Sequence, residues 1–356
     1  MINDHIIVIM PVYNPSIYTV RLCERLIVEY KYIIIVDDGS EKRYNHYFNK
    51  IKTLGEIGWL FHDINMGKGK AIKDAIKYGL KTYDKEISSG KIIGFITCDA
   101  DGQHDVKDIK EISSKLCEEE YDLILGSRNF DNNTPLRSKF GNELTSKVLN
   151  FVHHIKLNDT QTGLRCFNIE FARNIQDIFG SRYEFEINML IFAKRNNYRI
   201  LEKKIQTIYI DDNAHSHFNP ILDSIKIYMV ILYELIQYCF VSLFSFICDF
   251  VMFCLISKLT LKYNHYILYS TVIARFFSSL INFLLNAHIV FKKKNINYKN
   301  IFKYYLLVII NMFLSAFLVS FFKKSFNGNL YTIKVIVDTS IFIIIYFINK
   351  YVVFFR

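Results

Sequence analysis

The segment FITCDADGQHD (residues 95–105) runs from an apolar stretch into two aspartates that are one residue apart. The apolar part has the character of a buried strand, and Asp99 and Asp101 stand where that strand ends. Two carboxylates this close repel each other, and burying them is costly unless a positive charge lies between them. In an extended chain both side chains share one face, with about 6–7 Å between Cα atoms. One divalent cation is therefore able to bridge them.

The predicted cation is Mg²⁺ or Mn²⁺. Both ions prefer oxygen ligands, and Mg²⁺ is typically held by one or two carboxylates together with substrate phosphates. We therefore predict that Asp99 and Asp101 bind a metal that also contacts a diphosphate, and that Gln103 adds an amide oxygen. The alternative is a solvated acidic loop. It is less favoured because a second acidic turn, VDDGS (36–40), follows another apolar strand.

Strands and helices alternate through the first half of the chain. The β-branched runs 5–10 and 32–36 are typical of buried parallel strands, and residues 16–30 between them have helical spacing. The alternation continues with strands at 57–63, 91–99 and 121–128 and helices at 71–83 and 105–118, the last with Asp105 as N-cap. This order predicts a doubly wound α/β domain with a mostly parallel sheet, in which ligands bind at the carboxyl ends of the strands.

The last third of the chain has the composition of a membrane domain. Residues 238–257, 267–291, 302–322 and 333–355 are apolar segments of roughly 20 residues or more, long enough to cross about 30 Å of hydrocarbon. After Gln237 the sequence has 13 Lys and Arg but only two acidic residues, so the net charge of +10 belongs to this apolar part. Such charge favours contact with anionic lipid and argues against nucleic-acid binding. We predict a catalytic domain at 1–218, an interfacial amphipathic connector at 219–237 and an all-α four-helix transmembrane bundle at 238–356.

The membrane part contains an internal repeat. FLLNAHIVF (283–291) and YFINKYVVF (346–354) share an aromatic residue, Asn and Val-Phe at the same spacing, with an offset of 63 residues. Two duplicated helical hairpins are therefore expected. Asp249, Arg275 and Asp338 lie within apolar runs, and we expect them to pair with one another inside the bundle.

The charge of the loops predicts the orientation in the membrane. The loop 292–303 carries five lysines, which places it and both termini in the cytoplasm. The apolar start, HIIVIMPVYNP, is too short and lacks the basic region of a signal peptide. We expect a multi-pass protein of the plasma membrane with its catalytic domain in the cytoplasm.

Two further turns carry groups suited to a nucleotide. Asp37 and Asp38 follow a buried strand, and their carboxylates are placed to accept hydrogen bonds from a base or a ribose. NMGKGKA (65–71) contains glycines that allow close backbone approach and Lys68, which is able to reach a phosphate. This segment lacks the spacing of a Walker A loop.

The motifs PVYNP, VDDGS, NMGKGKA, CDADGQHD, GSR and DTQTGLRCF, in this order, resemble glycosyltransferase family 2. The similarity is greatest to its polyprenyl-phosphate branch, which includes dolichyl-phosphate mannose synthases, and the C-terminal part resembles the GtrA-like membrane domain. Together the two resemblances cover essentially the whole chain and imply a GT-A-type fold. Many members have Glu where this chain has Pro15, so the base of the nucleotide, guanine or uracil, stays open.

The resemblance implies an inverting, metal-dependent transfer of a sugar from a GDP- or UDP-linked donor to a polyprenyl or dolichyl phosphate. A phosphate acceptor is already an anion, so the reaction needs no strong base. Arginine suits the lipid phosphate because it makes bidentate contacts. The implied catalytic residues are Asp99, Asp101 and Arg128; those on the nucleotide side are Pro11, Tyr13, Asn14, Asp37, Asp38, Lys68, Asp99 and Ala100; those on the acceptor side are Arg128, Arg137, Asp159, Gln161, Arg165 and Ser216.

Two other functions remain open at this point. One is transfer to another membrane-bound lipid acceptor; the other is translocation of a lipid-linked sugar by the helical bundle. A processive polysaccharide synthase is less favoured because the chain lacks the QxxRW motif. The expected partners are a nucleotide sugar, a polyprenyl phosphate and the membrane, with a homo-oligomer as a further possibility.

Overall fold

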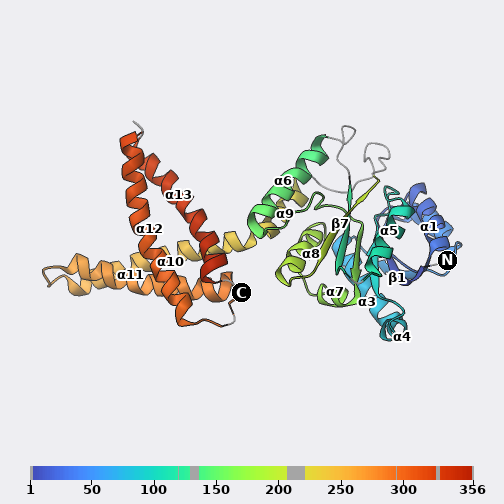
Figure 1. Ribbon diagram of the computed structural model, residues 1–356, viewed down its shortest axis with the longest axis horizontal. Coiled ribbons are helices and arrows are strands. Elements are labelled where there is room, and N and C mark those ends of the chain that lie inside the picture. The colour runs from blue at the N-terminus through green and yellow to red at the C-terminus, as the bar shows by residue number, and fades with distance from the viewer. Residues whose placement is uncertain are drawn as a thin grey trace. The chain divides into compact units, whose positions relative to one another are not determined.

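The computed structural model of the protein describes residues 3–118, 120–128, 136–206, 221–293, 295–325 and 329–354. The chain divides into two compact units, Met1–Ile231 and Leu232–Arg356, called the N-terminal and C-terminal units below. Figure 1 shows an α/β N-terminal unit and an all-helical C-terminal unit.

The N-terminal unit is built on one seven-stranded mixed sheet. The strands lie in the order β3-β2-β1-β4-β6-β5-β7, and every neighbouring pair is parallel except the two that involve β6. The predicted GT-A-type α/β fold with a mostly parallel sheet is confirmed, whereas the antiparallel β6 lies in a segment for which no strand was predicted. The strands are β1 (Asn3–Val12), β2 (Tyr30–Asp38), β3 (Gly58–His62), β4 (Gly94–Thr97), β5 (Leu123–Arg128), β6 (Arg165–Asn168) and β7 (Ile200–Ile205).

Helices cover both faces of this sheet. Apolar residues of α1, α2 and α5 form one buried cluster with alternate residues of the central strands, while α3 packs against the other face, where Ile34 and Phe95 lie. The helices are α1 (Ile17–Glu29), the 3₁₀ turn η1 (Lys42–Tyr44), α2 (Asn45–Lys52), α3 (Lys68–Thr82), α4 (Asp84–Ser88), α5 (Val106–Leu116), α6 (Leu136–His153), α7 (Ile169–Asn174), α8 (Glu184–Arg195) and α9 (Leu222–Ile231).

Side-chain caps fix where two of these helices begin. Ser16 and Thr19 form a reciprocal capping box at the start of α1. Asp105 accepts a hydrogen bond from the Lys107 backbone N–H at 2.9 Å, which confirms it as the N-cap of α5. Both caps fix the directions in which the chain leaves the loops at the carboxyl ends of β1 and β4.

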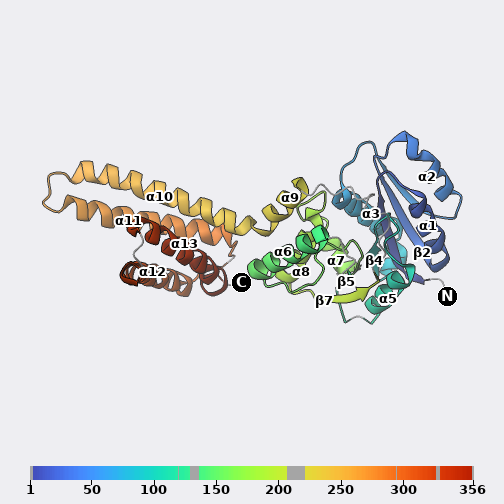
Figure 2. The same cartoon turned by 90° about the horizontal axis from the view of Figure 1, so that it is seen from above.

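The C-terminal unit consists of two helical hairpins, with α10 beside α11 and α12 beside α13 (Figure 2). By length and composition four of its helical segments are able to cross a membrane, which confirms the predicted count. The helices are α10 (Tyr233–Thr260), α11 (Tyr266–Leu285), η3 (Asn286–Val290), α12 (Tyr298–Ser325), α13 (Leu330–Ile348) and η4 (Asn349–Val353).

The internal repeat appears as matching π-helical turns. The motif Asn of each copy, Asn286 or Asn349, is buried and begins a five-residue π-helix, η3 or η4. Hydrogen bonds from the second hairpin reach the first: Asn349 donates to the Tyr238 hydroxyl at 3.2 Å, and the Tyr304 hydroxyl donates to Asn282 Oδ1 at 2.8 Å. The two hairpins are thus joined by hydrogen bonds within an aromatic core.

The intramembrane charges pair within hairpins. Arg275 lies 3.4 Å from Asp249, which also accepts a hydrogen bond from Ser278. Asp338 pairs with Lys334 at 2.8 Å instead of with the other two charges. Lys334, one helical turn before Asp338, supplies the nearer cation. Of the expected pairing among the three charges, the Arg275–Asp249 pair is therefore present, and Asp338 pairs with Lys334 instead.

We predict that Tyr304→Phe weakens the contact between the two hairpins. Interhelical hydrogen bonds in membrane proteins contribute about 0.6 to 1.7 kcal/mol, so the midpoint of thermal unfolding in detergent should fall. Tyr269→Phe is the matched control, because the hydroxyl of this exposed tyrosine makes no hydrogen bond within the described part of the chain. Equal midpoints for the two variants would refute the proposed strength of the contact.

Candidate active site

The carboxyl ends of the parallel strands bring several predicted site residues to one edge of the sheet. Val12 of β1 is in register with Asp37 of β2, and Ile9 of β1 is in register with Thr97 of β4. The loops after these strands therefore begin next to one another. They carry the PVYN, VDDGS and CDADGQ motifs.

Asn14 joins the first two of these loops. Its backbone N–H donates to Ser40 Oγ at 2.9 Å, and its side-chain oxygen accepts from the Glu41 N–H at 3.0 Å. Asn14 adopts φ 53°, a left-handed conformation that asparagine tolerates better than most residues. Asp37, near the end of β2, accepts from the Ser40 N–H at 2.9 Å and is half-buried. Pro11, at the end of β1, and Tyr13, in the loop after it, are also partly accessible.

Asp38, which was expected to contact the nucleotide, is bound by groups of the protein itself. Its buried carboxylate accepts from the backbone N–H groups of Met66 and Gly67 at 2.9 and 2.8 Å and lies 2.7 Å from His62 Nδ1. These partners occupy both oxygens. Asp38 thus shapes the glycine loop that precedes Lys68, and we assign it no direct contact with a ligand.

Lys68 is shared between two carboxylates. Its Nζ lies 2.6 Å from Asp99 Oδ1 and 2.8 Å from Glu186 Oε1. The Glu186 side chain is 2% exposed, whereas 31% of the Asp99 side chain is exposed. A cation from α3 therefore compensates the aspartate that ends β4 and a glutamate in the first turn of α8.

These contacts shift the pKa values of the site in opposite directions. Burial alone would raise the pKa of Asp99, but the charge of Lys68 and the contact with His104 outweigh it and hold this pKa below its usual value. Burial, followed by repulsion from Asp99, raises the pKa of Asp101. For Lys68, Asp99 and Glu186 outweigh burial and raise the pKa. The lysine therefore stays charged and keeps Asp99 ionised, while Asp101 lacks such compensation.

Asp101 lies in the turn after Asp99 and has no ion pair among the described residues. Its Oδ1 accepts from the Gln103 N–H at 3.0 Å. The Ala100 carbonyl between the two aspartates accepts from Thr19 Oγ1 at 2.8 Å, which fixes the turn against α1. A carboxylate without a cation, beside a second carboxylate, is suited to a metal ion.

His104 also faces this position. It is buried, its Nε2 lies 3.5 Å from Asp99 Oδ2, and neither ring nitrogen makes a hydrogen bond in the described part of the chain. Among the described residues no group of three or more His, Cys, Asp and Glu side chains is arranged to hold a metal unaided. Asp99 and Asp101 would therefore share a metal with ligands from a substrate.

Gly163 lies directly against Asp99. A Cβ at this position would stand 2.2 Å from Asp99 Oδ2, so only glycine leaves room for the carboxylate. The Gly163 carbonyl accepts from Thr97 Oγ1 at 2.8 Å, which ties the DTQTGLR loop to the end of β4.

On the far side of the edge, Arg128 is held by Asp159. Its Nε and Nη2 donate to the two oxygens of this buried carboxylate at 2.7 and 3.1 Å. The Gln161 N–H donates to Asp159 Oδ1 at 3.1 Å. The structure thus brings together three of the predicted acceptor-side residues, with Arg128 oriented by a bidentate ion pair.

Arg165 differs from the expected phosphate contact. It is 1% exposed, and its guanidinium donates to the backbone carbonyls of Thr160, Thr162 and Glu186. A buried guanidinium fixing three carbonyls has a structural role. Arg137 lies in the first turn of α6, and Ser216 lies outside the described residues.

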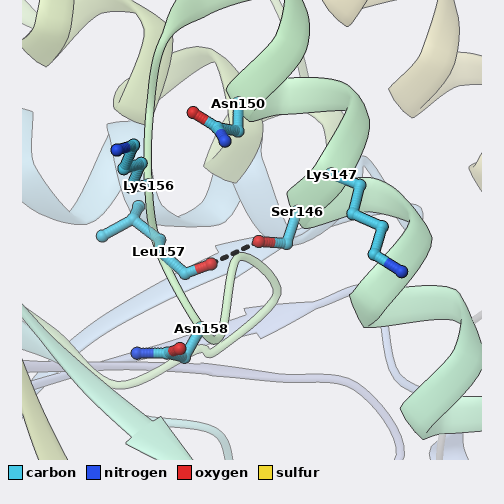
Figure 3. A pocket seen from close by; sticks show the side chains of 6 residues that line it. All are labelled: Ser146, Lys147, Asn150, Lys156, Leu157 and Asn158. Atoms are coloured by element: carbon cyan, nitrogen blue, oxygen red, sulfur yellow. Dashed lines mark hydrogen bonds between the residues drawn. The ribbon is translucent and has the colours of Figure 1, made fainter.

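A polar hollow of about 270 Å³ lies away from these residues, between α6 and the segment 156–158 (Figure 3). Ser146, which lines it, donates to the Leu157 carbonyl, and Lys147 pairs with Glu143. None of the predicted site residues lines this hollow.

Sequence reasoning missed Glu186, His104 and Gly163. Glu186 stands in an acidic first turn of a helix, which is typical of a solvated helix start. His104 and Gly163 both lay in motifs that had been singled out, CDADGQHD and DTQTGLRCF, but no role was predicted for either residue. The closeness of Gly163 to Asp99 depends on the antiparallel β6.

The described residues thus combine an α/β unit that has acidic turns at its strand ends with a helical unit that has four segments long and apolar enough to cross a membrane. Residues 7–177 match the family described as Glycosyl transferase family 2, and residues 237–354 match the GtrA/DPMS transmembrane domain. The chain belongs to glycosyltransferase family 2 and is a glycosyltransferase.

Three similar proteins illustrate the relationship. An uncharacterised protein of Methanocaldococcus jannaschii is 33% identical over 219 residues, which cover 59% of this chain and 84% of the relative. The UDP-N-acetylglucosamine–dolichyl-phosphate N-acetylglucosaminyltransferase of Methanococcus voltae is 28% identical over 230 residues, covering 59% and 88%. The crystal structure of glucosyl-3-phosphoglycerate synthase from Mycobacterium tuberculosis has a TM-score of 0.48 at 13% identity, covering 65% and 79%.

We predict that Gly163→Ala destabilises the N-terminal unit. Its Cβ would displace the Asp99 carboxylate from Lys68, and overpacking of this kind typically costs about 1–3 kcal/mol. Thermal unfolding of the full chain in detergent measures the loss. Gly141→Ala is the control, because nothing lies within 4 Å of the added Cβ; an equal midpoint for both variants would refute the close contact.

Proposed function

We propose that the protein transfers a sugar, with inversion, from a nucleoside-diphosphate sugar to a polyprenyl phosphate, with Mg²⁺ or Mn²⁺ as cofactor. The observation that carries the proposal is the Asp99–Asp101 pair at the end of β4 in a chain that also has four membrane-length helices. The names of similar proteins support the acceptor class, since they include a dolichyl-phosphate N-acetylglucosaminyltransferase and a dodecaprenyl-phosphate galacturonate synthase.

The residues at β4 fit a divalent cation. Asp101 has no ion pair within the described residues, its pKa is raised by burial and by Asp99, and the ring nitrogens of buried His104 lack hydrogen bonds in the same part of the chain. Asp99 and Asp101 would hold the ion, with Gln103 as a third oxygen ligand. When bound, such an ion neutralises the charge that develops on the departing diphosphate.

The donor nucleotide is assigned to the loops after β1 and β2. Pro11 lies at the end of β1, Tyr13 and Asn14 lie in the loop after it, and the partly accessible Asp37 lies at the end of β2. Lys68 is the cation for the diphosphate, and the Ala100 backbone lies between the two metal ligands. We favour uridine as the nucleoside because the Methanococcus voltae relative uses a UDP-sugar.

The lipid phosphate is assigned to Arg128. Gln161 and Arg137 are further candidates for this contact, on the basis of their motifs. The bidentate pair with Asp159 holds the guanidinium in one orientation before the acceptor binds, so less conformational entropy is lost on binding. Ser216 remains a sequence-based candidate. A phosphate oxygen is an anion at neutral pH, and direct attack on the sugar carbon would invert its configuration without a general base.

Exposed apolar side chains of the N-terminal unit also suit a lipid acceptor. Phe140, Leu144 and Phe151 are exposed on α6, and Ile225 and Met229 are exposed on α9. Apolar patches of this kind mark membrane or ligand contacts. We propose that residues 1–218 act at the cytoplasmic face of the plasma membrane, that 219–237 lie at the interface and that 238–356 span the bilayer.

The full-length protein in liposomes provides the test. UDP- and GDP-sugars are supplied with undecaprenyl or dolichyl phosphate, and the glycolipid product is identified by mass spectrometry. We expect a polyprenyl-phospho-sugar that forms with Mg²⁺ or Mn²⁺ and disappears with EDTA. Activity that survives EDTA would contradict the metal role, and transfer to diacylglycerol alone would contradict the acceptor.

We predict that Asp101→Asn lowers the transfer rate by at least about a hundredfold, because metal-ion charge stabilisation contributes several kcal/mol. The substitution removes a metal ligand but keeps the size of the side chain. The rate is measured with saturating nucleotide sugar and lipid. Asp63→Asn, at an exposed position, is the control. The expected loss of rate for Asp101→Asn is about a hundredfold, so a loss of less than about threefold would rule out its role as a metal ligand.

A further inference from the structure

The ammonium of Lys68 occupies one of the two oxygens of Asp99, the carboxylate that is proposed to bind a metal ion. Nζ lies 2.6 Å from Asp99 Oδ1, and a divalent cation close to that oxygen would repel the lysine. A metal and Lys68 therefore compete for Asp99. The lysine is nearly buried, and an unpaired buried ammonium carries a large desolvation penalty.

Glu186 is the second partner of Lys68, and its segment is held firmly against the start of α3. The start of α3 packs tightly on the segment 181–186: a Cβ at Gly67 would lie 2.6 Å from the Ser181 carbonyl, and a Cβ at Gly69 would lie 2.5 Å from Phe185 Cβ. The Lys70 N–H also donates to the Ser181 carbonyl at 2.9 Å.

The two carboxylates differ in how they are held. The Glu186 side chain is buried, and the Arg165 guanidinium donates to its backbone carbonyl. The positive charge of Arg165 also interacts favourably with the Glu186 carboxylate. Asp99 is more exposed, and its Oδ2 lies 3.5 Å from the Nε2 of His104. When one of the two contacts opens, the structure favours retention of the Lys68–Glu186 pair.

We propose that Glu186 is a positioning residue: it retains the Lys68 ammonium when a divalent cation takes Asp99, and so makes metal binding compatible with a charged lysine at the diphosphate. The inference rests on the metal site of the proposed function. Without Glu186, release of Asp99 leaves Lys68 buried and unpaired, so the metal has to overcome a stronger Lys68–Asp99 pair.

The test is a double-mutant cycle on Mn²⁺ affinity, measured by electron paramagnetic resonance. The full chain in detergent is titrated with Mn²⁺, first alone and then with UDP, without sugar donor or lipid. We expect Glu186→Gln to weaken Mn²⁺ binding by about tenfold. In the Lys68→Met background, the same substitution should change the affinity by less than about twofold, because the competing ammonium is gone.

Glu29→Gln is the matched control for the change of charge. Glu29 pairs with Lys110 at 2.7 Å on the surface of the same unit, and its loss should leave Mn²⁺ affinity unchanged. Thermal unfolding checks that each variant folds. If Glu186→Gln alone fails to fold, comparison of Lys68→Met with the double variant still decides, because a change above about twofold there overturns the inference.

The outcomes separate the two proposals. Equal weakening by Glu186→Gln with and without Lys68 would show that Glu186 acts only through its own charge, which would overturn the positioning role and leave the metal site intact. Unchanged affinity in Glu186→Gln would do the same. Absence of Mn²⁺ binding by the wild-type chain, with and without UDP, would overturn the metal site and the inference with it.

Discussion

The site depends on the compensation of Asp99 by Lys68. A carboxylate at the end of a buried strand is stable as an anion only if a cation is held beside it, and here the cation comes from the first residue of α3. This geometry requires close approach of three segments. Glycines at 67 and 69 let α3 meet the segment 181–186, and Gly163 leaves room for the carboxylate itself. The two ion pairs of Lys68, with Asp99 and with Glu186, and the close approach of Gly163 thus link the end of β4, α3, α8 and the loop before β6.

Much of the fold followed from local patterns. The strands near 5–10 and 32–36 are β-branched because the sheet buries both their faces, and each of the four membrane-length helices contains an apolar stretch long enough to cross a bilayer. The Asp99–Asp101 pair was visible for the same reason: a polar pair directly after a buried strand. The antiparallel β6 had no such pattern, because its four residues, Arg165–Asn168, gain their pairing only from β4 and β5.

The roles of single polar residues were harder to predict. Asp37 and Asp38 are adjacent in sequence, yet only Asp38 points into the glycine loop and is consumed by protein donors. Glu186 is far from Lys68 in sequence, and nothing in a helix-start pattern indicates that its carboxylate turns inward. The duplicated membrane motif had a similar limit. Its offset predicted two hairpins but not the hydrogen bonds of Tyr238 and Tyr304 that join one hairpin to the other.

The charges on the two sides of the site suit the two anionic substrates of the proposed function. Around Asp99, Asp101 and Glu186 the carboxylates outnumber the one ammonium that is shared there, so bare phosphate is repelled and a divalent cation is attracted. Around Arg128 the guanidinium is matched by Asp159, which leaves little net charge to attract a metal. In the proposed function, a diphosphate would therefore bind on the first side only together with its cation. A phosphate monoester would bind on the second side, where an oriented guanidinium supplies directional hydrogen bonds.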